Sequence, residues 1–209
     1  MSISRVELLN YLDAELNSKL IKDYSPNGLQ VEGKSTINKM ITGVTASAAL
    51  IDRAIENEAD AILVHHGYFW KGEDPCIQGM KKRRIAALLK ADVSLLVYHL
   101  PLDVHSRFGN NVQLAQRLGI SVDGGLEPGK QNSIGLYGHL TEAMSGEGFS
   151  RLIECSLDRK PLHIAGSDRT IERVGWCTGS AQGYIQQAID LGLDAYITGE
   201  VSESTVHTA

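Results

Sequence analysis

The sequence contains little cysteine, and its spacing fits neither a disulfide framework nor a paired-cysteine metal site. Only three cysteines occur in 209 residues, and they are far apart at Cys76, Cys155 and Cys177. That count and spacing argue against the cysteine arrangements of secreted scaffolds and zinc ribbons. The N-terminus also lacks the apolar segment of a signal peptide. We therefore expect reduced thiols and a cytoplasmic location.

Long apolar runs and long basic runs are also absent. No apolar stretch approaches the roughly 18 residues that a membrane span needs, so no membrane partner is expected. The formal net charge is -5, and residues 81–84 form the one basic cluster. A nucleic-acid partner is therefore not favoured, because phosphate backbones require a broad basic surface. Neither the glycine-rich dinucleotide fingerprint nor the phosphate loop ending in Gly-Lys-Ser/Thr occurs.

What the sequence does contain is a regular alternation of short apolar runs and helical patterns. Strands are expected at 40–45, 61–64 and 93–98, with helices at 46–58 and 81–91 between them. Parallel strands require such crossovers, so the pattern predicts an α/β fold. A glycine-rich stretch at 123–132 reads as a linker. We therefore expect a metal-binding α/β domain over 1–125 and a second α/β domain over 126–209.

The last third of the chain repeats the first. Residues 188–200 align with residues 54–66, because both begin Ala-Ile-acid and continue with Asp-Ala and an aliphatic strand. This predicts two related α/β domains built from a duplicated β-α-β unit, with sheets flanked by helices. Gly199 and Glu200 take the place of the histidine pair described next. Glu200 is thus a candidate pocket carboxylate, and a solvated strand-end glutamate is the alternative.

Two adjacent histidines follow the apolar run 61–64. His65 and His66 stand before Gly67, at the point where the strand is expected to end. Ligands of open α/β sheets bind beyond the carboxyl ends of such strands. Neighbouring residues of a strand point to opposite faces, which makes it difficult for one ion to bind both rings. Where the backbone bends at a strand end, each imidazole can serve its own ion.

A second group of metal-ligand residue types follows the strand at 93–98. His99 comes directly after it and Asp103 four residues later. Imidazole and carboxylate together suit Zn, Mn, Fe or similar ions, and Asp103 can bridge two of them. His99 is a candidate ligand, hydrogen-bond donor to a ligand, or general acid. Asn27 is a candidate pocket residue, with a simple turn as the alternative. The remaining histidines are expected to be structural.

These segments together resemble the GTP cyclohydrolase I type 2 homolog family, whose members have a dinuclear metal centre and form toroids. The resemblance runs in the family's order from about residue 23 to the end of the chain. It is carried by the segments 25–33, 42–47, 64–67, 99–103, 109–111, 114–115 and 197–200.

The resemblance implies a two-domain α/β fold and a ring-shaped homohexamer. It also implies two divalent ions per subunit, of Zn, Mn, Fe, Co or Ni, held partly by His65, His66 and Asp103. Such a protein would hydrolyse a nucleotide or similar polar substrate through metal-activated water. The alternative is a non-catalytic metal-binding scaffold or protein-interaction ring.

One part of the family pattern is missing. The family site is completed near its C-terminus by a stretch resembling Gly-His-His-x-x-Glu, and no such stretch occurs here. The sequence ends at Ala209, inside a helix expected to begin near Ser202. We therefore expect a truncated chain with an incomplete site. Metal binding would then be weak, mononuclear or absent, and activity would be lost.

Overall fold

The computed structural model describes residues 2–209, and the chain divides into two compact units, Met1–Leu102 and Asp103–Ala209. The division falls between Leu102 and Asp103 rather than at the boundary of 125 and 126 predicted from composition. The reason is that β7 (Ile120–Gly125) is hydrogen-bonded to a strand of the second sheet. Among the described residues, no helix combines the length and the apolarity that crossing a bilayer requires.

The first unit contains a four-stranded sheet in the order β2-β6-β5-β4. Its last three strands are parallel, and β2 runs antiparallel to β6 at the edge. Two helices make the parallel crossovers, as the alternating pattern predicted. The elements are β2 (Gly28–Val31), β4 (Met40–Thr45), α2 (Ala48–Glu56), β5 (Ala61–His66), α3 (Gly79–Lys90) and β6 (Ser94–Val97).

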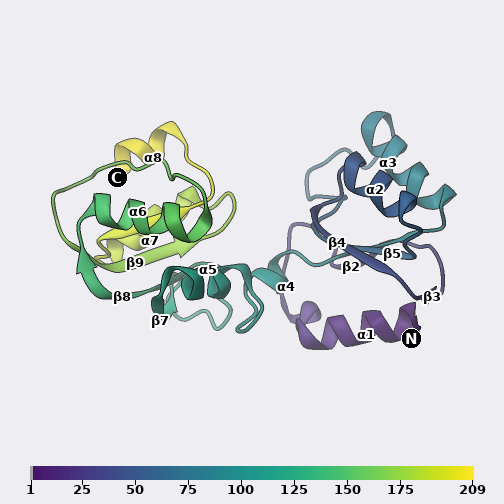
Figure 1. Ribbon diagram of the computed structural model, residues 1–209, viewed down its shortest axis with the longest axis horizontal. Helices are drawn as coiled ribbons and strands as arrows, with labels where there is room; N and C mark the ends of the chain where they lie inside the picture. Colours follow the sequence, from purple (N-terminus) through teal and green to yellow (C-terminus); the bar gives the residue numbers. More distant parts are fainter. Residues whose placement is uncertain (1) are drawn as a thin grey trace. The chain divides into compact units, whose positions relative to one another are not determined.

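Both faces of this sheet are buried, which explains why β5 and β6 read as continuous apolar runs. Ile62 and Val64 belong to the core cluster that also contains residues of α2 and α3. Ala61 and Leu96 belong to the cluster against which leucines of α1 (Arg5–Glu15) pack. Figure 1 shows α2 and α3 on one side of this sheet and α1 on the other. The unit is therefore a three-layer α/β/α arrangement.

The N-terminal helix begins with a capping box. The Ser4 hydroxyl accepts a hydrogen bond from the Glu7 amide at 3.1 Å, and the Ser4 amide donates to the Glu7 carboxylate at 3.1 Å. The helix ends at Glu15 and a short 3-10 turn, η1 (Ser18–Leu20), follows it. A small antiparallel pair, β1 (Ile3–Ser4) with β3 (Thr36–Ile37), joins its start to the loop before β4.

The second unit contains a mixed sheet in the order β10-β9-β8-β7, with β9 and β10 parallel. Part of the stretch predicted as a linker is strand, because Gly124 and Gly125 pair with Tyr137 and Leu136 of β8. Trp176 is fully buried, and its indole N–H donates to the Asn111 carbonyl at 2.9 Å. The remaining elements of the chain are α4 (Leu100–Asp103), α5 (Asn110–Leu118), β8 (Leu136–Met144), α6 (Gly146–Leu157), β9 (Ile171–Cys177), η2 (Gln182–Tyr184), α7 (Ile185–Asp190), β10 (Ala195–Thr198) and α8 (Glu203–Thr208).

The two copies of the predicted β-α-β unit match in individual hydrogen bonds as well as in topology. β4-α2-β5 and β9-α7-β10 are both parallel strand pairs joined through a helix. In the first, the Asp60 carboxylate accepts from the amides of Asn38 and Lys39 at 2.8 and 3.0 Å. In the second, Asp194 accepts from the amides of Glu172 and Arg173 at 3.1 and 2.8 Å. The repeated aspartate therefore joins the start of one parallel strand to the start of its neighbour.

Asp60→Asn tests this fastening. The Lys34 ammonium, 2.7 Å away, and then two backbone amides lower the pKa of the buried Asp60 carboxyl to about 2, against the opposing effect of burial. Because this pKa lies below the unfolded value of about 3.9, the stabilisation is complete above about pH 4 and is lost as pH falls toward 2. We expect Asp60→Asn to lower the free energy of unfolding at pH 7 by about 1–2 kcal/mol.

The measurement is urea unfolding at pH 7 and at several values between pH 4 and 2. The difference between wild type and Asp60→Asn should shrink as pH falls. Asp52→Asn, on an exposed position of α2, is the matched control and should change little. A difference that stays constant down to pH 2 would contradict the assignment.

Candidate metal centre

Three imidazoles of the first unit converge at the carboxyl ends of β5 and β6. The ring centroids of His65 and His66 are 4.6 Å apart, and those of His65 and His99 are 4.9 Å apart. One potential ligand nitrogen from each ring lies within 4.8 Å of those of the other two. Two parallel neighbouring strands thus bring His65, His66 and His99 together at one edge of the sheet.

The two adjacent histidines lie closer together than strand alternation suggests. β5 includes both of them, whereas the sequence placed them just beyond the strand. His66 is still paired in the ladder, since its carbonyl accepts from the Ala46 amide at 2.9 Å. Even so, the two rings are tilted by 47° and near each other rather than on opposite faces. Strand alternation alone would put the two rings on opposite faces, and this strand end departs from it.

His65 and His66 are oriented by oxygen atoms of neighbouring segments. The Nδ1 atom of His65 lies 3.1 Å from the Tyr98 carbonyl oxygen, and that of His66 lies 3.2 Å from the Thr45 hydroxyl. A carbonyl oxygen only accepts, so the neutral His65 ring carries its proton on Nδ1 and its lone pair on Nε2. Metal-binding histidines in proteins are commonly held in this way.

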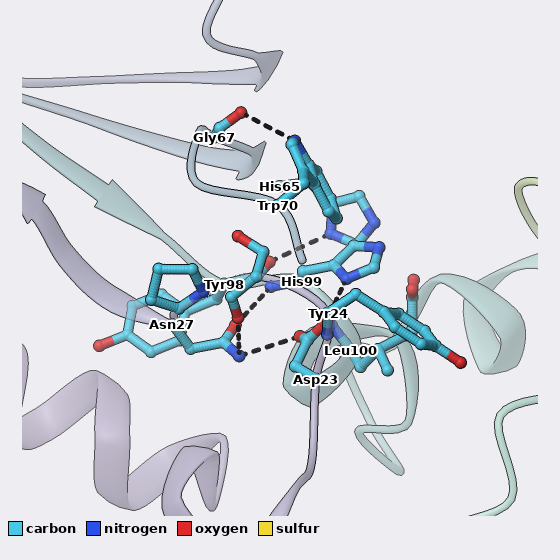
Figure 2. A network of polar contacts seen from close by, with 12 residues as sticks. Asp23, Tyr24, Asn27, His65, Gly67, Trp70, Tyr98, His99 and Leu100 are labelled. Carbon is cyan, nitrogen blue, oxygen red and sulfur yellow. Dashed lines mark hydrogen bonds and ion pairs between the residues drawn. The ribbon is translucent and has the colours of Figure 1, made fainter. Parts of the chain in front are cut away.

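The third ring is oriented by the carboxylate of Asp23. Asp23 is buried, with 3% of its side chain exposed, and accepts from the Nδ1 of His99 at 2.8 Å. It also accepts from the Leu100 amide at 2.8 Å and from the Asn27 side-chain amide at 2.9 Å. Asn27 in turn accepts from the His99 amide at 2.8 Å. The network is drawn in Figure 2.

The charge on Asp23 is held by these contacts. Burial alone would raise the pKa of its carboxyl, but the hydrogen bonds from His99, Asn27 and the Leu100 amide outweigh burial and lower the pKa to about 2. An ionised carboxylate cannot donate, so the neutral His99 ring carries its proton on Nδ1 and its lone pair on Nε2. His99 therefore has its proton and its lone pair on the same atoms as His65, but its partner is a charged carboxylate rather than a carbonyl oxygen.

The donor set fits a divalent transition metal ion. Imidazole nitrogens bind Zn, Fe, Co and Ni at about 2.0–2.1 Å, so ligands of one ion lie at most about 4 Å apart. The observed separations of up to 4.8 Å are somewhat longer than this value, so the rings would have to move closer together to bind one ion. The three side chains are partly buried, which reduces competition from bulk water.

Asp103 and Glu200 belong to the second unit. Asp103 ends α4, is buried, and accepts from the Asn110 side-chain amide at 2.7 Å. Burial and then the charge of Asp103 raise the pKa of the Cys177 thiol to about 12, which makes that thiol unreactive. Glu200 follows β10, is exposed, and lines a cavity of about 540 Å³ within the second unit. Their membership of the histidine site stays a prediction.

Asp23 was missed because no local pattern marks it. It lies in the segment 23–28, whose Asp, Ser, Pro, Asn and Gly residues are typical of turns. Its partner His99 is 76 positions away in the chain. Asn27, which the sequence proposed as a pocket residue, was the nearest signal. The structure places Asn27 in the network through hydrogen bonds to both Asp23 and His99.

Comparison with known proteins agrees with this geometry. A family model described as "Duf34/NIF3 (NGG1p interacting factor 3)" matches residues 3–209. This chain belongs to the DUF34/NIF3 family. The match covers nearly every described residue, and it confirms the resemblance stated from the sequence motifs.

Similar members of the DUF34/NIF3 family are named GTP cyclohydrolase 1 type 2 homolog. The protein of Pseudomonas aeruginosa is 55% identical over 209 residues, which are 100% of this chain and 82% of that protein. The protein of Escherichia coli K12 is 50% identical and covers 99% of this chain, again matching 82% of the relative. The α/β fold is shared with solved structures of this family.

Two of those solved structures are similar over almost the whole chain. Protein ybgI, described as of unknown function, has a TM-score of 0.93 at 50% identity, covering 99% of this chain and 82% of its own. The protein TTHA1606 from Thermus thermophilus has a TM-score of 0.83 at 33% identity, covering 99% of this chain and 81% of its own.

Asp23→Asn tests whether this carboxylate organises the cluster. Removing its charge should let the His99 ring rotate and lose its fixed Nδ1 proton. We expect the affinity for Zn²⁺ to fall about 10–100-fold, as is typical when the partner of a metal-binding histidine is removed. The measurement is competition with a chromophoric chelator, with circular dichroism to confirm folding.

A second histidine–aspartate pair provides the control. Asp123 accepts from the Nδ1 of His139 at 2.9 Å, and both side chains are largely exposed. Asp123→Asn should leave Zn²⁺ affinity unchanged. Wild-type affinity in Asp23→Asn would show that Asp23 does not support the cluster.

Proposed function

We propose that this protein binds divalent metal ions through His65, His66 and Asp103, with His99 beside them, and hydrolyses a polar substrate of the nucleotide class. The observation that supports this most is the convergence of three oriented imidazoles at the carboxyl ends of two parallel strands. Ligand sites of α/β folds lie at such edges. The names of similar relatives point to guanine nucleotides as the first substrates to test.

The metal and the protein groups would have distinct roles. A bound divalent ion would supply a water whose pKa is lowered toward about 7, so that hydroxide forms at neutral pH. His99 presents its Nε2 lone pair to the same space, and this atom can accept a proton from that water or act as a further ligand. The ionised Asp23 would stabilise the imidazolium that forms when His99 accepts a proton, as in catalytic triads.

Two features of the proposal rest on the family resemblance rather than on contacts within one unit. One is the second metal ion, with Asp103 as the bridging carboxylate. The other is assembly into a homohexamer. Metal identity within the series Zn, Mn, Fe, Co and Ni also stays open to measurement, because these ions accept overlapping sets of imidazole and carboxylate ligands.

His66→Ala and Asp103→Ala should each lower the number of metal ions bound per chain. The ions are counted by inductively coupled plasma mass spectrometry after loading with Zn²⁺ or Mn²⁺ and desalting. His139→Ala, which removes a largely exposed imidazole elsewhere, is the control and should keep the wild-type count. Unchanged counts in both His66→Ala and Asp103→Ala would refute these ligands.

Removing the metal distinguishes a metal-dependent hydrolase from a non-catalytic metal-binding scaffold. We expect nucleotide hydrolysis, tested first with GTP and then with other nucleoside triphosphates, to disappear with chelator and to return when the ion is added back. The measurement is chromatographic quantification of product against time. Bound metal without turnover of any nucleotide in the panel would instead support a non-catalytic metal-binding scaffold.

A further inference from the structure

Trp70 contacts the histidine cluster, and Tyr24 directly follows the aspartate that orients His99. The Trp70 ring is nearly perpendicular to the His99 ring, at 86° with centroids 4.9 Å apart, and its centroid is 6.0 Å from that of His66. Tyr24 directly follows Asp23, and 59% of its surface is exposed. In the view of Figure 2, Trp70 and Tyr24 lie on opposite sides of His99. Neither ring belongs to the proposed set of metal ligands.

The segments that carry these two rings are tied to each other. The Lys71 amide donates to the Tyr24 carbonyl at 2.6 Å, which joins the loop before β2 to the loop after β5. The Trp70 indole N–H donates to the Gly67 carbonyl at 3.2 Å, and its backbone amide donates to the Glu73 carboxylate at 3.2 Å. A backbone hydrogen bond thus joins the two segments, and the indole N–H of Trp70 holds that ring in place.

The backbone just before Trp70 is in an unusual conformation. Phe69 has a φ of 65°, in the left-handed region that bulky residues rarely adopt. Its ring is held against Tyr68, with centroids 6.4 Å apart, and the Lys81 ammonium lies 4.8 Å from its centroid. Such strain is typical of functional sites, where surrounding contacts maintain it. Here it accompanies the tight turn that returns Trp70 toward the histidines.

We propose that Trp70 and Tyr24 are specificity-determining residues that hold a planar heteroaromatic ring of the substrate beside the histidine cluster. This inference rests on the proposed function and adds the substrate class to it. Aromatic side chains bind flat rings by stacking, without selecting one base from another. An exposed phenol and a partly exposed indole at a polar cluster provide such surfaces, and the polar atoms of the ring would face the imidazoles.

The test is a fluorescence titration of the full chain with guanosine, in parallel with and without Mn²⁺. The chain has two tryptophans, and Trp176 is fully buried in the second unit. Guanosine should therefore quench the emission of Trp70 in wild type. Ribose and tripolyphosphate, which lack an aromatic ring, should not quench it or compete with guanosine.

Variants separate stacking from simple packing, with guanosine affinity measured by isothermal titration calorimetry. Trp70→Leu should weaken guanosine binding about tenfold, and Trp70→Phe should restore most of it, because a flat ring is retained. Tyr24→Leu should weaken binding about fivefold. Tyr11→Leu is the matched control, since Tyr11 lies on α1 and is 62% exposed, and it should bind as wild type does.

Three results would overturn the inference: no binding of guanosine by wild type, wild-type affinity in Trp70→Leu, or competition by ribose as strong as that by guanosine. Metal counts on the same variants keep this test apart from the proposed function. Normal metal uptake with unaffected guanosine affinity in Trp70→Leu refutes the aromatic site alone. Loss of affinity in Trp70→Leu without any metal uptake by wild type supports the aromatic site and refutes the metal chemistry.

Discussion

The hydrogen bond between the buried Asp23 carboxylate and the His99 ring is the interaction on which the site depends. A buried carboxylate is costly unless its oxygens are satisfied, and Asp23 is satisfied by the side chains of His99 and Asn27 and the amide of Leu100. The same contacts join the loop before β2 to the end of β6. The hydrogen bonds that orient the His99 ring therefore also hold the two segments together.

The sheet supplies the other requirement, which is to bring distant residues to one edge. β5 and β6 pair in parallel from Ala61↔Ser94 to Val64↔Val97, so His65 and His99 follow adjacent strand ends. Largely apolar strands between two helical layers specify this register. The duplicated unit in the second half uses the same aspartate to join strand to strand. A common scaffold thus occurs twice, and the histidines are present in only one copy.

Much of this could be predicted from the sequence, because the signals are local. The apolar runs predicted β4, β5 and β6, and the internal repeat predicted the two β-α-β units. The segments shared with known proteins identified the family. Because parallel strand ends lie at one edge of a sheet, His65, His66 and His99 could also be named as candidates for one site.

The rest depends on contacts between segments far apart in the chain. In the sequence, Asp23 looks like a turn residue and Trp70 like a loop residue. Only the structure shows Asp23 bonded to His99 and the Trp70 ring beside the imidazoles. The glycines at 124 and 125 suggest a linker, whereas pairing with β8 makes them strand. Local composition carries no information about such pairings.

The most direct test of the central claim is X-ray absorption spectroscopy of the Zn²⁺-loaded protein at the zinc edge. A site formed by these histidines should show at least two imidazole nitrogens at about 2.0–2.1 Å, with the outer-sphere scattering of the rings. A spectrum fitted by oxygen ligands alone, without imidazole outer-sphere scattering, would contradict the account.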